Sequence, residues 1–179
     1  MKSQIFFIVT FSITVVLFFC NRVDAQDLEP GKVLPELTPE QRMERLTTHL
    51  NAIIFSIIDY VVKQGEDLEE IGRHVGELFA KSWPDDATPE FYVTSMNNNW
   101  QMYGVTTEVI EVKDDYIKAR RGRVQFDENM ERAYQNVYGY GIAEFEKFFR
   151  YVEKGITTAL ELEISQRVED EYIVFTVTQ

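Results

Sequence analysis

The fold of this chain is decided by its C-terminal residues 160–179, which read LELEISQRVEDEYIVFTVTQ. Apolar and polar side chains alternate over residues 160–168 and again over residues 172–177. Alternation over two short runs predicts two half-buried strands, and the Glu169-Asp170 pair between them predicts a tight turn. The C-terminus is therefore predicted to be a β-hairpin.

A second hairpin is predicted upstream. Two β-rich runs, residues 105–112 and 116–126, are joined by the polar residues Lys113, Asp114 and Asp115. A short polar connection between two such runs is typical of a hairpin turn.

The rest of the chain shows helical periodicity. Apolar spacing and capping residues predict five helices, over about residues 38–64, 67–82, 88–103, 128–138 and 142–154, the last one ended by Gly155. Helices that precede and separate two hairpins predict an α+β fold. We expect the helices to pack on one face of a four-stranded antiparallel sheet built from the two hairpins.

One helix carries a clear apolar stripe. In the predicted helix 67–82, the apolar residues that share a face are Leu68, Ile71, Val75, Leu78 and Phe79. This stripe is predicted to be the buried side of the helix.

The N-terminus has the pattern of an export signal. Lys2 precedes the apolar run Ile5–Phe19, and Ala25 ends a small-residue cleavage pattern. We expect a signal peptide over residues 1–25, cleaved after Ala25, then an extended leader over 26–37 and a single α+β domain over 38–179. The expected location is periplasmic or secreted. A lipoprotein through Cys20 is the alternative, and after cleavage at Ala25 no cysteine and no membrane span would remain.

The charge balance restricts the partners. The 179 residues include 18 Lys+Arg and 30 Asp+Glu, a formal net charge of −12. A nucleic-acid-binding surface needs clustered positive charge to neutralise phosphates, so we expect no nucleic-acid partner.

The C-terminal half resembles a known family. Its matching elements are the helix with Phe145, Phe148 and Phe149, the strand residues 159–167, and the turn and strand 168–175, preceded by a hairpin within residues 100–126. In this order they resemble the aminothiazoline-carboxylate hydrolase-like family and, more distantly, vinyl-reductase-type small-molecule-binding domains. The resemblance implies a similar fold with a ligand pocket.

The chain departs from this family at its cysteines. The family's cysteines would fall near residues 121–123, near 142–143, and at Ile173 or Val174, where this chain has none. The departure argues against a transferred hydrolase activity, so we lean toward a protein that is not an enzyme.

Four cations lie close together in this acidic chain: Lys118, Arg120, Arg121 and Arg123. Strand alternation separates them, because Arg121 shares a face with Ile117 and Ala119. An inward arginine would be a carboxylate clamp. Alternatively, all four lie on the outer face and pair with Glu108 or Glu111. We favour the second interpretation.

Aromatic residues indicate where a pocket would lie. Tyrosines gather around Gly139 and Gly141, and Trp100 and Tyr103 end the third predicted helix. Tyrosine and tryptophan suit a cleft that holds an amphipathic ligand, but they equally suit the edge of a core or a dimer contact.

Metal ligands are sparse. His74 lies on one helix with Glu70 and Glu77 at helical spacing, which would suit a metal site but equally suits a solvated face. We favour the solvated face, and we expect neither a metal nor a cofactor.

Three functions remain compatible with the sequence. The leading interpretation is an exported, non-catalytic protein that binds a small apolar or aromatic acid. Its expected ligand-binding residues are Arg121, Arg123, Tyr138, Tyr140, Trp100 and Glu146, the arginines holding the anion and the aromatic residues the ring.

The other two interpretations depend on different residues. One is a hydrolase or lyase that uses a pocket carboxylate such as Glu144 or Glu146 instead of cysteine. The other is an interaction protein that forms a homodimer through the apolar Ile53–Val62 helix.

Overall fold

The structure is a computed structural model that describes residues 36–179. The predicted signal peptide, with its cleavage after Ala25, and residues 26–35 of the predicted leader lie outside this range. By its internal contacts the chain divides into two units, Met1–Ile57 and Ile58–Gln179. Within residues 36–179, no helix combines the length and the hydrophobicity needed to cross a membrane.

Helix α2, Pro39–Gln64, crosses the boundary between the units. It begins with a capping box. The amide of Gln41 donates to Thr38 Oγ1 at 3.2 Å, and the amide of Thr38 donates to Gln41 Oε1 at 2.9 Å.

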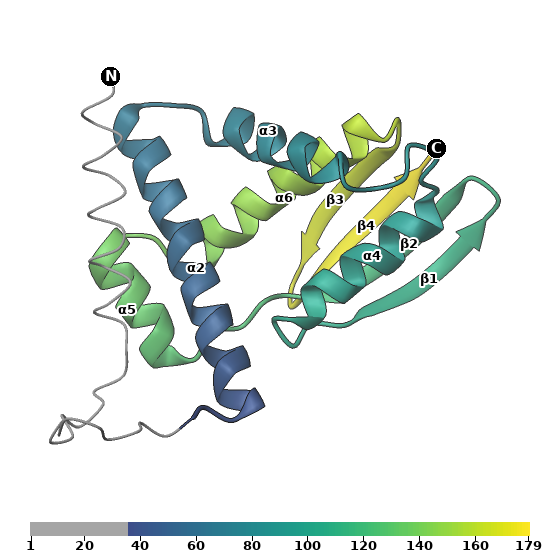
Figure 1. The fold of residues 1–179 in the computed structure, drawn as a ribbon. Coiled ribbons are helices and arrows are strands. Elements are labelled where there is room, and N and C mark those ends of the chain that lie inside the picture. Colours follow the sequence, from purple (N-terminus) through teal and green to yellow (C-terminus); the bar gives the residue numbers. More distant parts are fainter. Residues whose placement is uncertain (1–35) are drawn as a thin grey trace, which may run out of the picture. The chain divides into compact units, whose positions relative to one another are not determined.

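The unit Ile58–Gln179 holds all the other described elements (Figure 1). In chain order they are α3 (Leu68–Ala80), α4 (Pro89–Gln101), β1 (Thr107–Lys113), β2 (Tyr116–Gly122), α5 (Glu128–Tyr138), α6 (Ile142–Ala159), β3 (Glu163–Glu169) and β4 (Tyr172–Thr178). The α+β class and both predicted hairpins are confirmed.

The four strands form one antiparallel sheet in the order β1-β2-β4-β3. Figure 1 shows the C-terminal strand β4, in yellow, beside both β3 and β2. The hairpins therefore join through β2 and β4, where Ala119 pairs with Phe175 and Arg121 with Ile173. The register of the β1–β2 hairpin shifts between Val109 and Glu111, which places a bulge at Ile110 in the edge strand β1.

The helices α4 and α6 contact this sheet, α4 at β2 and β4, and α6 at β3. The strand residues that share the covered face are buried: Ile117, Ala119, Arg121, Ile173, Phe175 and Val177. Burying one face of a hairpin sheet under helices explains why its strands alternate in polarity.

Helices α3 and α6 pack through glycines, which corrects two predictions. Gly155 was expected to end its helix, but α6 continues to Ala159. The absence of a side chain at Gly155 lets α3 approach, because a Cβ there would lie 2.0 Å from the carbonyl oxygen of Arg73.

The predicted buried stripe of α3 is also wrong in part. The buried residues of this helix are Gly72, Gly76 and Ala80, whereas Leu78 and Phe79 are 49% and 56% exposed. Hydrophobicity alone pointed to the large residues, but the close helix contact is made by the small ones.

Candidate functional site

A buried arginine lies near the end of the inner strand β2. Arg121 on β2 is only 2% exposed, and its guanidinium lies over the Trp100 ring, 3.8 Å from the ring centroid. The preferred sequence interpretation, in which all four cations face outward, is therefore wrong for Arg121. It is right for Arg120, which pairs with Glu108.

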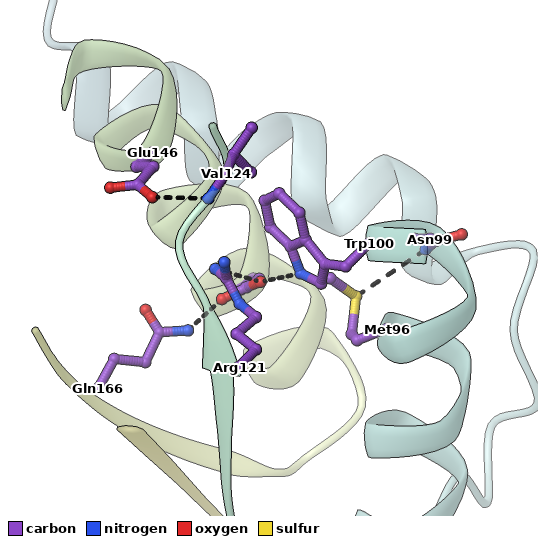
Figure 2. Close-up of polar contacts among 8 residues, drawn as sticks. Met96, Asn99, Trp100, Arg121, Val124, Glu146 and Gln166 are labelled. Atoms are coloured by element: carbon purple, nitrogen blue, oxygen red, sulfur yellow. Dashed lines mark hydrogen bonds and ion pairs between the residues drawn. The ribbon is translucent and has the colours of Figure 1, made fainter. Parts of the chain in front are cut away.

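Glu153 of α6 neutralises this arginine. Its Oε1 accepts hydrogen bonds from Arg121 Nη2 at 3.2 Å and from Trp100 Nε1 at 2.8 Å, and its Oε2 accepts from the side-chain amide of Gln166. Figure 2 shows Arg121, Trp100 and Gln166 converging from β2, α4 and β3. A buried charge needs such a partner, because it has lost its hydration.

We call Trp100, Arg121, Glu153 and Gln166 the buried cluster. A few buried polar atoms in the cluster, and one in Tyr92, make no hydrogen bond to a described residue. Within residues 36–179, Arg121 Nη1, Gln166 Oε1 and the Tyr92 hydroxyl have no hydrogen-bond partner. Burial, together with the negative charge of Glu153, raises the pKa of Tyr92 well above its usual value. Tyr92 therefore stays neutral in the folded protein.

A second arginine–glutamate pair lies just beyond the end of β2. Arg123 donates from Nε and Nη2 to Glu146 Oε2, at 2.9 and 2.7 Å. The other carboxylate oxygen of Glu146 accepts from the amide of Val124 at 3.2 Å, as Figure 2 shows. These bonds to Glu146 raise the pKa of Arg123, and they hold a buried carboxylate in place.

Arg123 also lines an open pocket of about 540 Å³. The wall of this pocket combines the α4–β1 connection, residues 103–106, with side chains of β1, β2, the segment after β2, and β4. The side chains in this wall include Tyr103, Glu108, Arg120, Arg123, Gln125 and Tyr172. The pocket lies within the unit Ile58–Gln179.

Tyr103 joins the pocket wall to the aromatic core. Its ring lies 5.8 Å from Trp100 and 5.6 Å from Phe145, measured between centroids. Its hydroxyl is buried and has no hydrogen-bond partner in the described part of the chain. Burial raises the pKa of Tyr103 to about 12, so this hydroxyl is neutral near pH 7.

Arg120 and Glu108 form an ion pair in the same wall. Arg120 Nε donates to Glu108 Oε2 at 2.8 Å, and Arg120 Nη2 lies 2.7 Å from the same oxygen. The guanidinium carbon of Arg120 lies 4.8 Å from the centroid of the Tyr172 ring.

The structure does not gather the six predicted ligand-binding residues into one site. Arg123 lines the pocket with Glu146 behind it, whereas Trp100 and Arg121 belong to the buried cluster. Tyr138 lies on α5, with its ring 6.4 Å from Tyr134, and neither Tyr138 nor Tyr140 lines the pocket.

The sequence interpretation missed Arg120, Gln125 and Tyr172 as wall residues and Glu153 as the buried carboxylate. The signal for Arg120 was its cross-strand position opposite Glu108, which the hairpin register fixes. No sequence signal links Glu153 to Arg121, because the two residues are 32 positions apart.

His74 does not gather metal ligands around it. It lies on the exposed surface of α3, with Nδ1 3.8 Å from Glu77 Oε2. The structure over residues 36–179 contains no group of three or more His, Cys, Asp or Glu side chains placed to hold a metal ion.

Comparisons with known proteins give the following findings. No protein-family description matches the chain, and no curated protein matches it. The solved structures similar to this chain include several H-NOX domains. One is an oxygen-binding H-NOX domain related to soluble guanylate cyclases, at 14% identity and a TM-score of 0.43, with 96% of this chain and 84% of that chain covered.

Another is the I5F mutant of the T. tengcongensis H-NOX domain, at 16% identity and a TM-score of 0.35, covering 96% of this chain and 93% of that chain. A third, from work on porphyrin distortion and haem redox potential, has 13% identity and a TM-score of 0.42, covering 96% and 89%. Likenesses this low carry no argument about what this chain binds.

These findings correct the sequence interpretation. The structural neighbours are H-NOX domains and not members of the aminothiazoline-carboxylate hydrolase-like family or vinyl-reductase-type domains, so that resemblance is wrong. The leading function, an exported hydrolase-like protein for an apolar or aromatic acid, falls with it. Helices around two hairpins are a common arrangement, and their order alone does not specify a family.

Among the described residues, the wall of the pocket offers no histidine or cysteine to a haem iron. The whole chain has two histidines and one cysteine, and none of them lines the pocket. His74 is exposed on α3, His49 belongs to the other unit, and Cys20 lies outside the described range.

Proposed function

We propose that the unit Ile58–Gln179 is a binding module for a small polar molecule that carries an anionic group. The observation that supports this proposal is the pocket of about 540 Å³, whose wall brings together Arg120 and Arg123. Ligand pockets of a few hundred cubic ångströms with a few convergent polar groups are typical of small-molecule sites.

The side chains of the two arginines are both partly exposed to solvent. The side chain of Arg120 is 41% exposed and that of Arg123 is 34% exposed, while Glu146 behind Arg123 is almost fully buried. A guanidinium carries five N–H donors. Because Glu146 accepts from Nε and Nη2 of Arg123, the remaining donors are available to a ligand.

The wall also supplies neutral polar groups. Gln125 contributes an amide and Tyr172 an aromatic ring with a hydroxyl group, whereas the hydroxyl of Tyr103 is buried. Such a wall favours a polar ligand over an apolar acid, and this separates the proposal from the ligand that the sequence predicted.

The test is a ligand titration of the full chain followed by ¹H–¹⁵N NMR. The probes are inorganic phosphate, succinate and benzoate, with choline as a cation of opposite charge. We expect phosphate or succinate to shift the backbone amides of residues 103–106 and 122–125. Choline should leave them unchanged.

The matched variants are Arg120→Gln and Arg132→Gln. Charge-assisted hydrogen bonds contribute enough that Arg120→Gln should weaken anion binding about tenfold or more. Arg132 is exposed on α5 and does not line the pocket, so its replacement should leave the affinity unchanged. If none of the three anions shifts these amides, the proposal is wrong.

Self-association through α2 is a second candidate. It is favoured by exposed apolar side chains that share one face of this helix, with Ile53 51%, Ile57 36% and Tyr60 43% exposed. Exposed apolar side chains on one element are typical of protein contacts. Sedimentation of the wild type against Ile53→Glu tests it: a dimer that becomes a monomer supports the candidate, and a wild-type monomer at high concentration contradicts it. Ile58 is fully buried and is unsuitable for this test.

A further inference from the structure

The ion pair between Glu108 and Arg120 occupies the pocket itself. Both side chains line the pocket wall, and both are exposed, at 64% for Glu108 and 41% for Arg120. Most ion pairs at a protein surface contribute little to stability, so this pair is not needed to hold the fold.

The pair occupies an edge of the guanidinium that an anion could use. Arg120 Nε donates to Oε2 of Glu108, and Nη2 lies 2.7 Å from the same oxygen in the ion pair. This edge of a guanidinium is one that a carboxylate or phosphate ligand can contact with two parallel hydrogen bonds. A ligand and Glu108 would therefore use the same donors.

Arg120 is held in place by more than Glu108. It lies on the central strand β2, where it pairs with Glu108 on one side and with Val174 on the other. Its guanidinium also lies over the Tyr172 ring, a contact that contributes favourably even at exposed sites. Arg120 would therefore keep its position if the Glu108 side chain moved away.

Glu108 is less constrained. It lies on the edge strand β1, two residues before the bulge at Ile110, and it accepts hydrogen bonds only from Arg120 in the described contacts. Glu146 is different, because it is buried and also accepts from the Val124 amide. Of the two arginines in the pocket wall, Arg120 is thus paired with an exposed glutamate held by one partner, and Arg123 with a buried glutamate held by two.

We propose that Glu108 is a built-in competitor: in the free protein it occupies the anion-binding edge of Arg120, and the anionic group of the ligand displaces it. This inference rests on the proposed function, since it concerns the same pocket. A competitor of this kind selects for ligands with strong acceptor groups. A doubly charged phosphate would displace Glu108 more readily than a singly charged carboxylate, because its attraction to Arg120 and Arg123 is larger.

The test compares phosphate affinity in the wild type, Glu108→Gln and Glu111→Gln, all as full chains at one ionic strength of about 0.15 M, where charges outside the pocket are screened. Glu111 is the matched control, because it also lies on β1 and also forms an ion pair, with Lys113, but does not line the pocket. Both substitutions remove one negative charge. We expect Glu108→Gln to bind inorganic phosphate about three- to tenfold more tightly than the wild type. Glu111→Gln should stay within about twofold of the wild type, the effect of a charge outside the pocket at this distance.

A second readout follows the Arg120 side chain itself. The Nε–H resonance of Arg120 should move on saturation with phosphate in the wild type. In Glu108→Gln it should already be displaced before phosphate is added, because its acceptor has changed.

The outcomes separate the two proposals. If the wild type binds phosphate and Glu108→Gln binds it equally or more weakly, the competitor role is wrong while the binding function stands. If both glutamine variants gain affinity equally, the gain is a general charge effect and the competitor role is again wrong. If neither the wild type nor Glu108→Gln binds phosphate or succinate, the proposed function fails and this inference fails with it.

Discussion

Gly76 of α3 and Gly155 of α6 lie backbone to backbone. A Cβ added at Gly76 would lie 2.9 Å from the Cα of Gly155 and 2.1 Å from the carbonyl oxygen of Val152. Because those neighbours are backbone atoms, they cannot move aside as the end of a flexible side chain could. The two helices are in contact only because both positions lack a side chain.

Gly76→Ala should therefore destabilise the protein. Alanine has a higher helix propensity than glycine by about 1 kcal/mol, but overpacking at this contact should exceed that gain and leave a net loss of about 2 kcal/mol. Urea denaturation followed by circular dichroism measures the change. The control is Gly122→Ala, where a Cβ would meet nothing within 4 Å, and an equal loss in both variants would contradict the packing argument.

Glu153→Gln should also be strongly destabilising. The substitution keeps the shape of the side chain but leaves the charge of buried Arg121 uncompensated, and breaking a buried pair in this way costs about 3–5 kcal/mol. Trp100 fluorescence during urea denaturation reports the change, since Trp100 donates to Glu153. The exposed pair gives the control: Glu108→Gln should change the urea midpoint little, and the idea fails if the two variants are equally stable.

The stability of the protein should fall at alkaline pH through Tyr103. Burial raises the pKa of Tyr103 to about 12, while in the unfolded chain it titrates near its usual value of about 10. The neutral form is favoured in the folded state, so this contribution is complete below about pH 10 and is lost as the pH rises toward about 12.

Thermal denaturation at several values between pH 9 and 11.5 measures this loss. Tyr103→Phe should reduce the loss of stability at alkaline pH. We assign the loss that remains to Tyr92, because burial raises the pKa of Tyr92 as well. Tyr140→Phe, at a half-buried ring outside the pocket wall, is the control. An unchanged alkaline profile in Tyr103→Phe would show that Tyr103 does not titrate in this range.

Tyr103→Phe should also raise the stability near pH 7. The variant removes a buried hydroxyl that has no partner among the described residues, and such a group costs about 1–3 kcal/mol. If a ligand uses this hydroxyl, the same variant binds it less tightly. The pair of measurements, urea midpoint and phosphate affinity, distinguishes a purely structural tyrosine from one that contacts the ligand.

Asn97→Ala should loosen the loop that forms one wall of the pocket. The side-chain Oδ1 of Asn97 accepts from the amide of Thr107 at 3.0 Å and so ties α4 to the start of β1 across residues 103–106. Its loss should cost about 1 kcal/mol and speed hydrogen exchange at the Thr107 amide. Asn98→Ala, at an exposed position of the same helix, should leave that exchange rate unchanged; equal acceleration in both would contradict the role of Asn97.

The local patterns of the sequence predicted the secondary structure because each element is marked by residues close in the chain. The Thr38 capping box, the Thr88 cap of α4 and the alternation of residues 160–177 all act over a few positions. Errors arose where the deciding partner is distant. Gly155 was expected to end its helix, because glycine is common at helix ends. The reason for glycine there is the approach of the Arg73 carbonyl from α3, which lies far away in the sequence.

The candidate site was predictable only in part for the same reason. Alternation along β2 placed Arg121 on the inner face, yet a buried charge is costly without a partner, and that partner, Glu153, lies on α6. Arg123 and Glu146 were both expected near a ligand, and the structure brings them together as an ion pair. Trp100 was expected to hold a ligand ring, but it lies under Arg121 instead.

The buried cluster has a consequence for how β2 is aligned in the sheet. Arg120 and Arg121 are adjacent, and a slip of β2 by one residue would exchange the faces on which they lie. Arg121 would then leave Glu153, and Arg120 would leave the pocket and Tyr172. The carboxylate of Glu153 thus favours one register of β2, the one in which Arg121 neutralises it. The same register places the neighbouring Arg120 on the surface, where an anion can reach it.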